Sequence, residues 1–198
     1  MTLPPRGTMS PILRGMGLLA RGRPEGLNSF RDTPRAFLYS LTPGFGILAG
    51  AVVEGMIERT SMQAVTDIPG TLCVLLAPAV ISYELARFWG REAFWYRYIV
   101  AFNWCRWLLL VLGFLLIIGL SLARLTGIAG QSGTRALIVG FAIYALWLNW
   151  FLARHGLAIS AGRAILLLVA VNLGTLAIVL GPAVVASMLA PMPATNLQ

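Results

Sequence analysis

The sequence predicts an all-α membrane protein whose chain crosses a bilayer about five times as helices, with a cytoplasmic N-terminus and an outside C-terminus. Of its 198 residues, 58% are hydrophobic and only 11% are charged, whereas a soluble domain carries about 25% charged residues. The apolar residues occur in long blocks, each near the roughly 20 residues that a spanning helix needs. The arginines lie mainly beside these blocks.

The first 35 residues form a basic arm ahead of the apolar blocks and contain six arginines. Ser10 followed by Pro11 is typical of a helix start, and apolar residues then recur near helical spacing. Two interpretations stay open: a short helix lying on the anionic inner leaflet, or an unstructured arm. The arm has no continuous apolar core with a small-residue cleavage site, so we expect no secretory signal peptide.

The first predicted span covers residues 36–57, and Thr33 before a proline marks the start of its helix. Within it, Gly46 and Gly50 form a GxxxG spacing, which lets a second membrane helix approach closely. The second predicted span covers residues 68–88 and contains two prolines. Membrane helices tolerate proline when neighbours satisfy the freed backbone groups. We therefore predict a kinked spanning helix, with a re-entrant segment as the alternative.

The remaining predicted spans cover residues 99–123, 136–152 and 164–189, which completes a single transmembrane domain. The stretch 84–98 is rich in charged and aromatic residues and is expected to form an interfacial turn or short helix. Residues 190–198 form a short, uncharged tail.

Arginine placement predicts the orientation of the chain. With five spans, one side receives eleven arginines, from the N-terminal arm and from the loops at 84–97 and 153–163. The other side receives only Arg59, Arg124 and Arg135. All six tryptophans also fall toward the arginine-rich side, as expected of an interfacial aromatic layer. The N-terminus is therefore expected in the cytoplasm.

Several predicted spans bring polar residues to a similar depth near the cytoplasmic side. A charged group at the centre of a membrane helix costs about 3 kcal/mol or more unless it is paired or reaches the interface. We predict that Arg106 pairs with Glu84, with Asn103 and Asn149 beside them. Polar contacts between helices, a headgroup or ligand site, and a site of chemistry stay open as interpretations. The full candidate cluster comprises Glu84, Asn103, Arg106, Asn149, Arg154, His155 and Asn172.

No motif indicates a catalytic, metal or cofactor site. The sequence contains no HExxH, P-loop, GxSxG or CxxC pattern, and the only histidine, His155, has no cysteine or acidic neighbour. Cys73 and Cys105 are expected near opposite ends of adjacent spans, too far apart for a disulfide. The net charge of +8 indicates anionic inner-leaflet lipid as a partner, and no nucleic acid, because the arginines lie beside apolar spans.

Two stretches, Phe102-Asn103-Trp104-Cys105-Arg106-Trp107 and Trp150-Phe151-Leu152-Ala153-Arg154-His155-Gly156-Leu157, are similar to segments of uncharacterised proteins from α-proteobacteria. That similarity implies a bacterial inner (cytoplasmic) membrane and no activity. Over residues 30–190, the five spans and the nearly absent tail resemble the Yip1-like group of small membrane proteins. This resemblance rests on topology and hydropathy, so it carries no functional residues over.

Three classes of function follow from these observations. We expect a non-catalytic membrane scaffold or accessory subunit, which packs against a larger membrane complex or organises lipid. A small transporter or channel acting as an oligomer is the first alternative, and a lipid-modifying membrane enzyme is the second. The expected partners are lipids of the inner leaflet together with a membrane protein or a second copy of the chain.

Overall fold

The computed structural model describes residues 9–58, 61–126 and 130–189, and this part of the chain consists of helices and turns without a β-strand. The predicted all-α class is therefore confirmed; the tail at 190–198 lies outside the described residues. In chain order the elements are α1 (Met9–Ala20), the 3-10 helix η1 (Pro24–Ser29), α2 (Pro34–Glu58), α3 (Ser61–Phe88), the 3-10 helix η2 (Glu92–Phe94), α4 (Trp95–Leu125), α5 (Gln131–Gly156) and α6 (Ala161–Leu189).

Four helical stretches in the described part are long and apolar enough to cross a membrane: Pro69–Phe88, Glu92–Leu125, Gln131–Gly156 and Ala161–Gly181. They lie in α3, α4, α5 and α6 and confirm a multi-pass membrane protein. The first predicted span forms α2, whose 25 residues would extend about 38 Å at the usual helical rise. Crossing by α2 stays a prediction.

The helices extend beyond the predicted apolar spans. α3 begins at Ser61, seven residues before the predicted span, and runs as one helix through Pro69 and Pro78. This continuity favours the spanning interpretation over the re-entrant one. α4 similarly begins at Trp95 instead of residue 99. Apolarity marks only the part of a helix that lies in hydrocarbon, whereas backbone hydrogen bonding continues into the polar flanks. At α2 the Thr33 hydroxyl accepts a hydrogen bond from the Ala36 amide at 3.3 Å, as expected of an N-cap.

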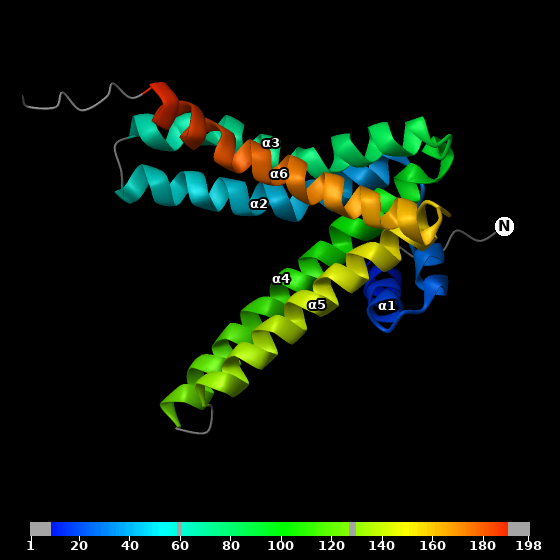
Figure 1. The fold of residues 1–198 in the computed structure, drawn as a ribbon, viewed down its shortest axis with the longest axis horizontal. Coiled ribbons are helices and arrows are strands. Elements are labelled where there is room, and N and C mark those ends of the chain that lie inside the picture. The colour runs from blue at the N-terminus through cyan, green and yellow to red at the C-terminus, as the bar shows by residue number, and fades with distance from the viewer. Residues whose placement is uncertain (1–8, 59–60, 127–129, 190–198) are drawn as a thin grey trace, which may run out of the picture.

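The long helices form two groups that meet at one end and diverge toward the other (Figure 1). α2, α3 and α6 pack together and are called here the three-helix arm, while α4 and α5 pair as the hairpin arm. α1 lies at the end where the arms join. The two arms thus resemble a V whose closed end holds most of the buried side chains.

The core lies at this junction of the arms. Tyr98 and Ile99 of α4, Leu152 of α5 and Leu167 of α6 are at most 2% exposed. α4 and α5 approach closely at Gly156, where an added Cβ would lie 3.0 Å from the Cβ of Tyr98. The geometry between the arms is therefore set by tightly packed residues at the closed end.

The N-terminal segment is part of this packed junction. α1 contacts α4 and α5, Leu19 is fully buried, and the Tyr144 hydroxyl of α5 donates a 2.8 Å hydrogen bond to the Ala20 carbonyl. Gly22 follows α1 with a φ of +72°, a conformation that glycine adopts without steric cost. The helical interpretation of this region agrees with the structure, although α1 begins at Met9, ahead of Ser10 and Pro11.

Candidate functional site

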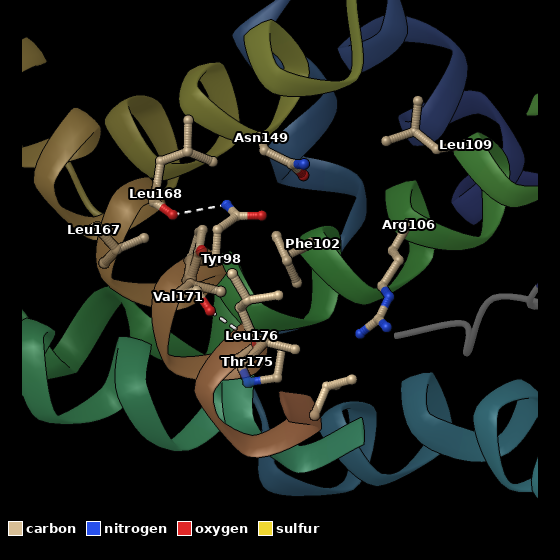
Figure 2. A pocket seen from close by; sticks show the side chains of 13 residues that line it. Tyr98, Phe102, Arg106, Leu109, Asn149, Leu167, Leu168, Val171, Thr175 and Leu176 are labelled. Atoms are coloured by element: carbon tan, nitrogen blue, oxygen red, sulfur yellow. Dashed lines mark hydrogen bonds between the residues drawn. The ribbon is translucent and has the colours of Figure 1, made fainter. Parts of the chain in front are cut away.

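A pocket of about 360 Å³ lies at the junction, where α4 and α5 meet α6 (Figure 2). This volume is at the lower end of the range for small-molecule sites, about 300–1,000 Å³. Most of its lining is aliphatic or aromatic, and Pro78 contributes from α3. The polar lining residues are Tyr98, Arg106, Asn149, Asn172 and Thr175.

Arg106 and Asn149 bring free hydrogen-bond donors to the pocket. In Figure 2 no dashed line joins the Arg106 guanidinium or the Asn149 amide to another residue that is drawn. Neither side chain forms a hydrogen bond or ion pair within the described part of the chain. A guanidinium carries five N–H donors and a side-chain amide carries two. The pocket therefore has an unused set of donors, one member of which is a permanent cation.

The two polar residues of α6 are engaged with their own helix. The Asn172 amide nitrogen donates to the Leu168 carbonyl at 2.7 Å, and the Thr175 hydroxyl donates to the Val171 carbonyl at 2.8 Å. These bonds leave the Asn172 carbonyl oxygen and the Thr175 lone pairs as acceptors on the α6 side.

The predicted ion pair between Glu84 and Arg106 is wrong within the described structure. Glu84 is exposed near the end of α3 and has no ion-pair partner among the described residues. The reason is the register of two antiparallel helices. The Trp95 indole of α4 donates to the Ser82 hydroxyl of α3 at 3.1 Å, which sets Glu84 level with the start of α4. Arg106 lies about 16 Å farther along α4 from Trp95 at 1.5 Å per residue.

Asn103 serves as a contact between helices on another side of α4. Its amide donates to the Ser40 hydroxyl of α2 at 2.8 Å, and this hydroxyl donates in turn to the Phe37 carbonyl at 2.7 Å. Ser40 is 1% exposed. The contact joins the hairpin arm to the three-helix arm beside the pocket, so Asn103 does not join Arg106 there.

Arg154 and His155 lie at the end of α5, outside the pocket lining. The Arg154 guanidinium lies 5.3 Å from the centre of the Trp150 ring, a cation–π geometry. The His155 ring lies 4.3 Å from the Phe151 ring, and its Nδ1 is 3.0 Å from the Phe151 carbonyl. The predicted cluster therefore divides: Arg106, Asn149 and Asn172 share the pocket, and the other four members do not.

Gly46 and Gly50 are not used for packing inside the described structure. Both are exposed, and an added Cβ would meet no atom within 4 Å at either position. The close approach of α2 to α3 occurs instead at Gly44, where an added Cβ would lie 2.7 Å from a methyl group of Leu75. The GxxxG surface of α2 is thus open.

Sequence reasoning missed several residues that hold this region together. Ser40 and Ser82 are buried hydroxyls that receive hydrogen bonds from α4, and Tyr144 anchors α1. A single serine or tyrosine in an apolar helix forms no repeating sequence pattern. Its role as an interhelical hydrogen-bond partner becomes visible only when the relative register of the two helices is known.

In the described residues no group of three histidine, cysteine or acidic side chains is arranged to hold a metal ion. Cys73 is exposed, Cys105 is buried, and both are free thiols. In comparisons with protein-family models, curated proteins and solved structures, no match to this chain was found.

Proposed function

We propose that this chain is a non-catalytic scaffold or accessory subunit that packs against another integral membrane protein. The observation that carries the proposal is the open Gly46–Gly50 surface of α2. Small residues at such spacing let helix backbones approach in a membrane, where association depends on close packing and interhelical hydrogen bonds. A flexible acyl chain can pack against any apolar helix surface, so lipid contact alone does not require glycines at these positions.

The apolar faces of the hairpin arm are also largely uncovered. Only 11% of the most apolar part of α4 is buried within the chain. Phe114, Leu115 and Ile117 of α4 are 56–64% exposed. An exposed apolar area of this extent marks a membrane or protein contact. Lipid and a partner protein can share this surface, whereas the glycine surface of α2 favours a helix.

We place the closed end of the V on the cytoplasmic side of a bacterial inner membrane. Arginines stacked on aromatic rings support this orientation: Arg154 lies over Trp150 and Arg163 lies over Trp89, with 6.0 Å to the ring centre in the second pair. Aromatic rings favour the interface, and cytoplasmic flanks are enriched in arginine. The guanidinium groups are then near anionic headgroups.

Native mass spectrometry after extraction in a mild detergent tests the proposal. The wild-type chain should retain one partner protein in a fixed ratio, and the variant Gly46→Leu/Gly50→Leu should lose it. Gly140→Leu is the matched control, because Gly140 of α5 also has no atom within 4 Å of an added Cβ. Recovery of the wild type alone, recovery as a homodimer, or equal complexes in both variants would contradict the proposal.

A further inference from the structure

The pocket at the junction of the arms is a cationic site with an apolar wall. Among the described lining residues none is acidic, and Arg106 is the one cationic member. Leu167, Val171 and Leu176 form part of the wall along α6. The pocket therefore combines a positive charge with a surface that suits hydrocarbon.

Among the residues whose side chains the structure describes, no carboxylate pairs with Arg106. Glu84 is displaced by the antiparallel register described above.

In the proposed orientation, Arg106 lies away from the membrane interface. From Arg97, which stacks over Phe94 at 5.6 Å near the start of α4, to Arg106 is about 14 Å of helix. At such a depth a guanidinium needs an anion, water or a path to the interface to offset its desolvation. Asn149 also lines the pocket from α5, while the Arg106 guanidinium points away from its amide (Figure 2), so Arg106 is the group that an anion would meet.

We propose that this pocket binds the phosphate of an anionic membrane phospholipid, with the phosphate on Arg106 and the acyl chains along α6. Arginine suits phosphate because its planar fork donates two parallel hydrogen bonds. The volume of about 360 Å³ holds a headgroup and the first part of the chains, and the exposed side chains of Leu176 and Val179 continue the apolar surface along α6. This site goes beyond the proposed scaffold role and does not depend on it.

The test compares lipid retention by the purified full-length protein in native mass spectrometry. Wild-type protein is loaded with phosphatidylglycerol or phosphatidylcholine of matched acyl chains. Both lipids carry the phosphate, but the choline cation of phosphatidylcholine opposes the positive charge of Arg106. We therefore expect about tenfold or greater preference for phosphatidylglycerol. Arg106→Gln should remove that preference, whereas Arg163→Gln should keep it, because Arg163 lies over Trp89 outside the pocket.

Two further variants keep the proposal falsifiable if Arg106→Gln does not fold. Arg106→Lys retains the charge without the fork and should keep part of the preference. Leu176→Trp fills the wall without changing charge and should reduce retention of both lipids. Equal retention of both lipids by the wild type, an unchanged preference in Arg106→Gln, or unchanged retention in Leu176→Trp would each overturn the proposal. Displacement of the lipid by millimolar inorganic phosphate would also overturn it, because the site would then take free phosphate.

Discussion

The contact between Gly156 and Tyr98 gives a sharp test of how the hairpin arm is held closed. In Gly156→Ala, the new methyl group would lie 3.0 Å from Cβ, 3.1 Å from Cδ2 and 3.2 Å from Cα of Tyr98. The Cα belongs to the backbone of α4, so side-chain rotation cannot relieve the overlap. Overpacking of this kind costs about 1–3 kcal/mol of unfolding free energy.

A second effect acts in the opposite direction. Alanine is favoured over glycine in a helix interior by about 1 kcal/mol, but Gly156 is the last residue of α5, where this gain is smaller. The steric cost should therefore dominate, and Gly156→Ala should destabilise the protein by about 1–2 kcal/mol. In the control Gly140→Ala, the methyl group meets open space, so the propensity gain stands alone and should be neutral to stabilising.

Thermal unfolding in detergent, followed by tryptophan fluorescence, measures the difference between these variants. A gap of about 1–3 kcal/mol between them corresponds to roughly 2–12 °C in the unfolding midpoint for a domain of this size. If Gly156→Ala is as stable as Gly140→Ala, then α4 and α5 do not approach at Gly156, and the junction described here is wrong.

Three further predictions concern polar contacts. A double-mutant cycle of Ser40→Ala and Asn103→Leu should give a coupling of about 0.6–2 kcal/mol, measured by unfolding in detergent; zero coupling would mean that their hydrogen bond is absent. Tyr144→Phe removes the hydrogen bond to the Ala20 carbonyl, which is worth about 0.5–1.5 kcal/mol. Since α1 should then open more often, trypsin should cleave at Arg21 roughly 2- to 12-fold faster. An unchanged cleavage rate would contradict this anchor. Glu84→Gln should change stability by less than about 0.5 kcal/mol and should add to the effect of Arg106→Gln, whereas a non-additive result would support an ion pair between them.

Much of the helical content could be predicted because hydrocarbon imposes a simple rule on the backbone. Every amide in a bilayer needs an internal partner, so long apolar blocks become helices. The same rule explains why α3 continues through Pro69 and Pro78. The predicted helix ends were less accurate. The predicted span ended at residue 152, whereas α5 extends to Gly156, because hydropathy alone does not assign the polar flank of a helix.

The site was predicted only in part. The sequence indicates how deep each residue lies along its own helix, but it does not indicate how two neighbouring helices are aligned. Counting residues from the interface placed Arg106, Asn149 and Asn172 at compatible depths, and these three share the pocket. The same counting placed Glu84 beside Arg106, although α3 and α4 are offset by the Trp95–Ser82 bond. The divergence of the two arms depends on contacts among distant residues, which no local pattern reports.

The central claim is that the basic N-terminal segment and the end of α6 lie on opposite sides of a membrane after five crossings. Reporter fusions at the two termini, one active only in the cytoplasm and one active only outside, measure this directly. We expect a cytoplasmic N-terminus and an external C-terminus. Reporters that place both termini in one compartment would contradict it, because α2 would then fail to cross.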